Sequence, residues 1–344
     1  MMRLGLAYDD VLLVPQYSEI ESRQNVNTEV EICTFFKRSV DYKNFMHPIV
    51  VANMSSLMSL DMSEAIMKSG GLAIDHRFEN NDQLENFKTL STNLSFDAQH
   101  YYAISVGVSE EDKKLANKFA EYGGTIVCLD IAHGDSRHGV AMTKYLKDMF
   151  PLVIAGNVCT EGGAKRLWDA GADIIKAGLG SGSLCSTRLV TGNGVPQFTA
   201  ISDIYEYLEK YSIKDKYIMA DGGAKYPGDL VKALTKSHMV MTGNLFAGSK
   251  ETPGTELIEN GISYKLYSGS STHKDSHVEG VRSLVKSKGS YQEILTTLLE
   301  GIRSGCSYQG VRNLTDLREN PQFIQVTGAG QIESAPHNLD KILK

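Results

Sequence analysis

The sequence predicts an α/β protein in which eight parallel strands close into a (β/α)8 barrel, the TIM-barrel architecture. Three observations predict it. Short apolar runs recur along the chain, stretches with helix start and stop signals separate them, and 344 residues fit one such barrel with extended loops. The runs are almost continuously apolar, which is typical of parallel strands covered on both faces. A doubly wound open sheet is the structural alternative that the same alternation allows.

The strands and helices are assigned from local patterns. The segment from Ser109 starts with Ser followed by acidic residues, which is a helix start signal. This segment and the one from Thr160 both end on Gly, which is a helix stop signal. The eight predicted strands are PIVVAN from Pro48, LAI from Leu72, YYAISVGV from Tyr101, IVCLD from Ile126, LVIAG from Leu152, DIIKAG from Asp173, YIMAD from Tyr217 and HMVMTG from His238.

Three segments exceed what a barrel unit needs. A glycine-rich loop with one cysteine, at about 178–197, follows the sixth strand, where barrel active sites are built. An irregular region at about 254–289, rich in Ser, Gly, Lys and His, follows the eighth strand and is predicted to be a mobile lid. A further helix precedes a tail at about 322–344. Because no linker or repeat divides the chain, residues 1–344 are expected to form one domain.

Composition excludes several classes of protein. The net charge of −6 argues against binding to nucleic acid or to an anionic membrane, and no apolar run approaches the ~20 residues of a membrane helix. Asp9 and Asp10 interrupt the N-terminal stretch where a signal peptide would be apolar. The five cysteines show no CxxC spacing, which argues against a zinc site or a disulfide framework. A cytoplasmic globular protein is therefore expected.

Two strand ends predict a phosphate site. Asp221, Gly222 and Gly223 follow the seventh strand, and Gly243 and Asn244 follow the eighth. Loops at these places in a barrel commonly bind phosphate, because glycines let backbone N–H groups approach the anion. The alternative is that the glycines only make tight turns. Two such loops at adjacent strand ends favour a phosphorylated ligand.

Cys185 is the candidate nucleophile. A thiolate attacks electron-poor carbon, provided that it is exposed and ionised. The alternative is a buried packing cysteine, but the neighbouring Gly and Ser residues give little to pack against.

Other strand ends carry polar residues that could either bind a ligand or stabilise the fold. Asp130 ends the fourth strand and could bind a sugar diol, whereas Asp135 or Ser136 would cap the next helix. His76 and Arg77 follow the second strand, where a lone histidine is commonly a core residue. No GxGxxG follows a strand, so a Rossmann dinucleotide site is not supported.

Seven motifs together resemble the IMP dehydrogenase and GMP reductase family. They are YDDVLLVPQ, AISVGV, IAHGDS, VIAGNV, GADIIKAGLGSGSLCSTRLVTG, ADGGAKYPGD and YKLYSGS, and they span nearly the whole chain.

The resemblance implies a barrel enzyme, usually a homotetramer, in which Cys185 attacks C2 of a purine nucleotide and Thr187 assists. The chain is most similar to the short-lid GMP reductase of Gram-positive bacteria, which implies NADPH as cofactor. If the chain has the family's potassium site, it also binds K⁺. The implied substrate-binding residues are Ser183, Asp221, Gly222, Gly223, Gly243, Asn244, Ser268 and Gly269. The implied cofactor-binding residues are His76, Arg77, Asp130, Ile131, Ala132, Gly178 and Gly180. The implied cation site takes carbonyls of Gly180, Gly182 and Cys185, with Glu333 and Ser334 across a subunit contact.

The lid departs from the reductase pattern. The reductase carries a Glu after the Gly-Ser turn, but here His273 and Asp275 occupy that stretch, so one of them is expected to transfer the proton or the substrate differs from GMP. The lid lacks the Arg-Tyr pair of the dehydrogenase. The regulatory (CBS) domains that are usually inserted in the dehydrogenase are also missing from this sequence. The tail nevertheless resembles that of the dehydrogenase. An IMP dehydrogenase that uses NAD, or a nucleotide-binding barrel without activity, stays open as an alternative.

Overall fold

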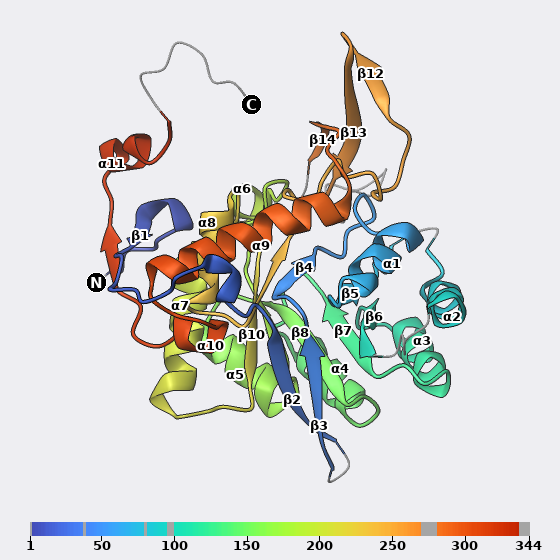
Figure 1. The fold of residues 1–344 in the computed structure, drawn as a ribbon. Helices are drawn as coiled ribbons and strands as arrows, with labels where there is room; N and C mark the ends of the chain where they lie inside the picture. Colours follow the sequence, from blue (N-terminus) through green and yellow to red (C-terminus); the bar gives the residue numbers. More distant parts are fainter. Residues whose placement is uncertain (1, 37–38, 79–80, 95–99, 270–280, 337–344) are drawn as a thin grey trace.

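Eight parallel strands form a nearly closed barrel in the computed structural model, which describes residues 2–36, 39–78, 81–94, 100–269 and 281–336 (Figure 1). The order is β4-β11-β10-β9-β8-β7-β6-β5, so each strand neighbours the next one along the chain apart from β4, which pairs with β11. Each of the eight predicted runs overlaps one barrel strand, which confirms the (β/α)8 barrel. The strands are β4 (Ile49–Val51), β5 (Ala73–Ile74), β6 (Tyr102–Val106), β7 (Ile126–Asp130), β8 (Leu152–Val158), β9 (Ile174–Ala177), β10 (Tyr217–Asp221) and β11 (Met239–Thr242).

Helices surround the barrel and begin where the sequence signals place them (Figure 1). The side chains of Ser109, Ser136 and Thr160 cap α3, α4 and α5 by accepting backbone N–H groups of the first turn. The helices are α1 (Leu60–Lys68), α2 (Gln83–Asn93), α3 (Glu110–Glu121), α4 (Arg137–Lys147), α5 (Glu161–Asp169), α6 (Thr187–Thr191), α7 (Gln197–Lys210), α8 (Pro227–Leu234), α9 (Tyr291–Tyr308), α10 (Leu314–Leu317) and α11 (Gly328–Glu333). Two 3₁₀ turns, η1 (Tyr8–Asp10) and η2 (Arg23–Asn25), precede the barrel.

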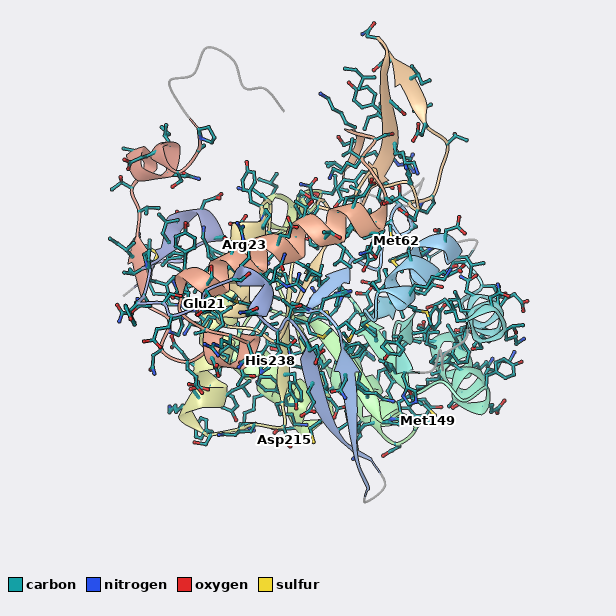
Figure 2. All side chains as sticks on the ribbon, in the orientation of Figure 1. Glu21, Arg23, Met62, Met149, Asp215 and His238 are labelled. Atoms are coloured by element: carbon teal, nitrogen blue, oxygen red, sulfur yellow. The ribbon has the colours of Figure 1, made fainter. Side chains whose placement is uncertain are left out.

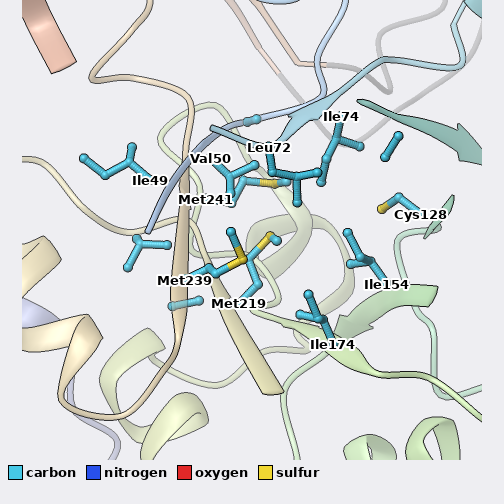
Figure 3. Packing of buried hydrophobic residues seen from close by; sticks show 14 of the residues in the cluster. Ile49, Val50, Leu72, Ile74, Cys128, Ile154, Ile174, Met219, Met239 and Met241 are labelled. Carbon is cyan, nitrogen blue, oxygen red and sulfur yellow. The ribbon is translucent and has the colours of Figure 1, made fainter. Parts of the chain in front are cut away.

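The interior of the barrel is filled by aliphatic and methionine side chains (Figure 3). Ile154, Ile174, Met219 and Met239 are all fully buried. Alternate residues of a strand share a face, so the residue two positions further along each strand also points inward, one layer higher. The strands therefore lead from an apolar core directly to the layer where the site lies.

A hairpin and a small sheet lie at opposite ends of the barrel. The hairpin of β2 (Val30–Phe36) and β3 (Ser39–Phe45) was not predicted, and its Cys33 N–H donates to the Tyr217 hydroxyl at the start of β10 (2.8 Å). Met149 and Asp215, which precede β8 and β10, lie at this same end (Figure 2).

The lid is a sheet over its described part. β12 (Leu257–Glu259), β13 (Ile262–Ser268) and β14 (Arg282–Lys286) pair antiparallel and project from the opposite end of the barrel (Figure 1). The prediction of an irregular excursion was therefore wrong for these strands. Residues 270–280 lie outside the described residues, and so do the predicted proton donors His273 and Asp275.

The tail returns to the start of the chain. β15 (Phe323–Gln325) pairs antiparallel with β1 (Val11–Leu13), and α11 follows it. Among the helices in the described part of the chain, none is both long enough and apolar enough to cross a membrane.

Candidate functional site

A cavity of about 460 Å³ opens at the carboxyl ends of the barrel strands. Asp130, Lys176 and Asp221 line it, and each lies one inward position beyond a buried residue of the same strand: Cys128, Ile174 and Met219. The cavity is where active sites of (β/α)8 barrels lie.

The glycine-rich segment forms one wall of the cavity and is held by an arginine. The Arg188 guanidinium donates to the carbonyls of Leu179 (3.2 Å) and Val195 (2.6 Å), which joins the two ends of the loop. A side chain at Gly180 or Gly194 would meet the Arg188 side chain at less than 3.0 Å, and both glycines have positive φ. The glycines therefore leave room for the arginine that shapes the loop.

Cys185 lies at the cavity and is exposed. Its Sγ is 3.0 Å from Thr187 Oγ1, so the predicted pair is brought together. Elsewhere burial raises the pKa of Cys128 and of Cys306 to about 12, which keeps both as thiols. Exposure at a cavity distinguishes Cys185 from these structural cysteines.

One side of the cavity holds the residues expected for the substrate. Asp221 Oδ2 accepts a hydrogen bond from Asn157 Nδ2 (2.7 Å), and Gly222 adjoins the cavity with φ of +88°. Tyr267 reaches the cavity from β13 and is buried. Burial raises the pKa of its phenol, which keeps the hydroxyl as a hydrogen-bond donor. Ser183 and Gly269 also line this cavity.

The opposite side holds residues expected for the cofactor. Asp130, Ile131 and Ala132 line it, together with Arg77, whose Nε donates to the Asp130 carbonyl (3.1 Å). Phe78 adjoins the Arg77 guanidinium, 5.0 Å from its ring centroid. This side therefore combines a carboxylate, a cation and an aromatic ring.

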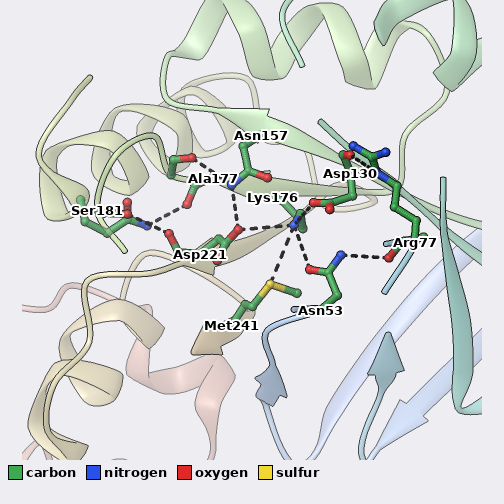
Figure 4. Close-up of polar contacts among 12 residues, drawn as sticks. Asn53, Arg77, Asp130, Asn157, Lys176, Ala177, Ser181, Asp221 and Met241 are labelled. Atoms are coloured by element: carbon green, nitrogen blue, oxygen red, sulfur yellow. Dashed lines mark hydrogen bonds and ion pairs between the residues drawn. The ribbon is translucent and has the colours of Figure 1, made fainter. Parts of the chain in front are cut away.

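A buried lysine connects the two sides (Figure 4). Lys176 Nζ lies 2.8 Å from Asp130 Oδ1 and 3.4 Å from Asp221 Oδ2. Asn53 Oδ1 is 3.5 Å away. Burial would lower the pKa of Lys176, but the two carboxylates raise it above its usual value, so the ammonium stays charged.

Several predicted residues lie next to the cavity without lining it. His76 is buried, and its Nδ1 accepts the Phe78 N–H (3.3 Å). The Asn244 carbonyl accepts from Lys288 (2.9 Å), and Ser268 exchanges hydrogen bonds with Ser56. Gly223 packs against the Tyr8 ring. Their expected ligand contacts stay predictions.

The two groups of residues predicted to form the cation site lie in different parts of this chain. The Gly180, Gly182 and Cys185 region borders the cavity, and the Gly182 carbonyl accepts the Cys185 N–H (3.0 Å). Glu333 and Ser334 lie on α11 and do not line the cavity. No cluster of three or more His, Cys, Asp or Glu residues within the described ranges is placed to hold a metal ion. The potassium prediction stays a prediction.

Six polar or aromatic residues that line the cavity were not among the predicted site residues: Asn53, Phe78, Asn157, Lys176, Ser181 and Tyr267. Lys176 is inside an otherwise apolar strand, which was the available signal. Asn53 and Asn157 follow apolar runs at strand ends, as Asp130 does. Tyr267 lies in the YKLYSGS motif, but it was given no role because its segment was assigned to an irregular lid.

The comparisons with known proteins agree with this geometry. The family model described as "IMP dehydrogenase / GMP reductase domain" matches residues 5–337. The chain is 40% identical over 256 residues to an inosine-5′-monophosphate dehydrogenase of Staphylococcus saprophyticus, which covers 68% of this chain and 52% of that protein. It is 39% identical over 258 residues to the enzyme of the same name from Staphylococcus aureus strain Mu50, which covers 69% and 52%. The chain thus spans about half the length of these curated relatives, and it belongs to the IMP dehydrogenase / GMP reductase family.

Proposed function

We propose that the chain is a purine nucleotide oxidoreductase that uses a nicotinamide cofactor, and specifically a GMP reductase. The observation that carries this proposal is the position of Cys185. Its exposed Sγ lies at a cavity with Asp221, Gly222 and Tyr267 on one side and Asp130 and Arg77 on the other. A nucleotide and a dinucleotide would thus meet at the thiol.

The reaction assigns a step to Cys185. Its thiolate adds to the electron-poor C2 of GMP, the C2–N bond breaks and ammonia leaves with a proton, which gives a thioether at C2. NADPH, when bound, supplies the hydride for C2. The thiolate then leaves, so that GMP, NADPH and two protons give IMP, NADP⁺ and ammonium. Thr187 Oγ1, 3.0 Å from Sγ, is placed to exchange a proton near the reacting carbon.

The binding residues divide according to their chemistry. The Asp221 carboxylate accepts hydrogen bonds from the nucleotide ribose hydroxyls, and the backbone N–H groups around Gly222 and Gly243 bind the phosphate with the Tyr267 hydroxyl. Asp130 accepts from the cofactor ribose, and Arg77 offers a cation to its phosphates.

The second candidate is IMP dehydrogenase, with NAD⁺ as oxidant. The names of the relatives favour it. The short lid without an Arg-Tyr pair favours the reductase, because the dehydrogenase pattern uses that pair to activate water for hydrolysis of its adduct.

One absorbance experiment tests both candidates. The protein is mixed with GMP and NADPH in one reaction and with IMP and NAD⁺ in another, and both are followed at the reduced-nicotinamide band with ammonia measured in parallel. Loss of NADPH with release of ammonia supports the reductase. NADH formed from IMP alone assigns the dehydrogenase. Nucleotide binding without turnover in either reaction contradicts both and leaves a binding barrel.

A further inference from the structure

Lys176 is the only lysine of the described residues that lines the cavity, and it does not reach the cavity as a free cation. Its side chain is 2% exposed, while those of Asp130 and Asp221 are 18% and 19% exposed. The ammonium thus lies beneath two carboxylates that face the ligand space from opposite sides. The binding of the nucleotide and of the dinucleotide could therefore depend on Lys176 without either ligand contacting it.

The surroundings of Lys176 are arranged to hold an extended side chain. A side chain at Gly156 on β8 would meet Lys176 Cβ at 2.5 Å, so glycine leaves room for the stem. At its tip, Asn53 Oδ1 faces Nζ while Asn53 Nδ2 donates to Ser105 Oγ (2.9 Å), which fixes the amide orientation. Met241 Sδ is 3.9 Å from Nζ.

The charges do not balance. Asp130 and Asp221 bring two negative charges to one ammonium, and Arg77 adds a positive charge only beside Asp130. The thiol of Cys128, also near Nζ, has its pKa raised to about 12 by burial and is neutral. Burial would raise the pKa of Asp130, but Lys176, together with Arg77 and Asn53, holds it below its usual value. Removing the ammonium would leave two partly buried carboxylates facing each other across the site.

We propose that Lys176 is a positioning residue that ties the two ligand-binding carboxylates to one cation, and so sets the affinity for the nucleotide and for the dinucleotide together. The inference rests on the proposed function, because it takes Asp221 and Asp130 as acceptors for the two ribose groups. The shared ammonium fixes the positions of the Asp130 and Asp221 carboxylates, so that each is directed at its ribose diol as a hydrogen-bond acceptor.

A matched pair elsewhere in the barrel separates this role from a structural one. Lys147 Nζ lies 2.8 Å from Asp173 Oδ2, with side chains 19% and 4% exposed, and neither residue lines the cavity. In each pair one partner is almost fully buried, Lys176 in the first and Asp173 in the second. Loss of stability alone would therefore be common to Lys176→Met and Lys147→Met.

The test measures binding of each ligand by itself. Calorimetry gives Kd for GMP, IMP, NADPH and NAD⁺ with wild-type protein, Lys176→Met and Lys147→Met, and thermal denaturation reports folding. Lys176→Met is expected to weaken both the nucleotides and the dinucleotides by roughly tenfold or more, since a buried charged partner is lost. Lys147→Met is expected to lower Tm and leave every Kd within about twofold.

The pH dependence gives a readout that a structural role would not move. Without Lys176 the pKa of Asp130 rises, so the acid limb of dinucleotide affinity is expected to move to higher pH in Lys176→Met. Arg77 stays beside Asp130 in both proteins, so its effect on the pKa of Asp130 is the same in both. An unmoved limb, or a folded Lys176→Met that loses affinity for one ligand class or neither, overturns the proposal.

A charge-balanced variant keeps the test decisive where Lys176→Met does not fold. Asp130→Asn combined with Lys176→Gln removes one charge of each sign. Its nucleotide Kd is expected to exceed that of Asp130→Asn alone, because Asp221 has lost its cation, and equal values overturn the proposal. Wild-type protein that binds a nucleotide without turnover contradicts the proposed reaction alone, since these measurements need no turnover.

Discussion

At the scale of single residues, exposure separates Cys185 from the structural cysteines. We expect Cys185→Ala to abolish turnover, by about 10³-fold or more, because none of the other described residues that line the cavity carries a thiol. Nucleotide binding should persist, since the Asp221 side of the cavity is unchanged. Steady-state rates and calorimetry check this. Cys33→Ala on the hairpin is the control, and turnover by Cys185→Ala near the wild-type rate would disprove the adduct.

Gly243 gives a second prediction at this scale. A Cβ at Gly243 would lie 2.5 Å from the Tyr267 hydroxyl, closer than real contacts allow. We expect Gly243→Ala to displace Tyr267 and raise the nucleotide KM by roughly tenfold, with a smaller change in kcat. Gly228→Ala is the matched control, because a Cβ there meets nothing within 4 Å. Equal KM values for the two variants would contradict the role given to Tyr267.

The residues predicted from sequence are those that stand in loops or at strand ends. Cys185, Asp130 and Asp221 were found because polar residues that follow apolar runs of a barrel come together at one end. Lys176 was missed because it lies within a strand, and its role depends on which two carboxylates lie above it. That juxtaposition requires the register of β7, β9 and β10.

At the scale of elements, one buried lysine binds the lid sheet to the segment that follows β11. Lys265 on β13 donates from Nζ to the carbonyls of Ser249, Lys250 and Thr252, at 2.8 to 3.0 Å. These carbonyls belong to the segment after β11, next to the expected phosphate loop. The lysine therefore joins the sheet that carries Tyr267 to that segment.

Removal of this contact should loosen the lid sheet. We expect Lys265→Met to deprive three carbonyls of their charged donor, to speed hydrogen exchange in 257–268 and to raise the nucleotide KM through Tyr267. Exchange measured by mass spectrometry and steady-state kinetics check both effects. Lys286→Met on the exposed face of β14 is the control. Unchanged exchange in 257–268 would show that other contacts hold the sheet.

The barrel strands and the lid differ in how far their sequence predicts them. A barrel strand is buried on both faces and reads as an apolar run, as in LVIAG from Leu152. The lid strands are mostly exposed, so polar and apolar residues mix along them. The β2–β3 hairpin was missed because polar residues such as Glu31 alternate with the buried Val30 and Ile32, so that no continuous apolar run marks it.

At the scale of the whole molecule, two buried histidines make folding sensitive to acid. Burial lowers the pKa of His47 from 6.5 to about 4, and it lowers that of His238 well below its usual value. His238 Nδ1 accepts the Ile218 N–H (3.1 Å), a bond that a protonated ring cannot keep. His47 Nε2 lies 3.0 Å from Ser69 Oγ, between the start of β4 and the end of α1. Both rings are held neutral in the folded protein.

The sign of the effect follows from the lowered pKa. Between pH 6.5 and 4 the unfolded chain binds more protons at these positions than the folded protein does, so the free energy of unfolding falls as the pH falls. For His47 the loss is about 2 kcal/mol at pH 5 and about 3 kcal/mol at pH 4. Urea unfolding at pH 7 and pH 5 measures it. We expect His47→Gln to be less stable than wild type at pH 7 and to lose about 2 kcal/mol less between the two pH values, whereas exposed His138→Gln should follow wild type. A His47→Gln protein that loses as much stability as wild type would show that His47 does not cause the acid sensitivity.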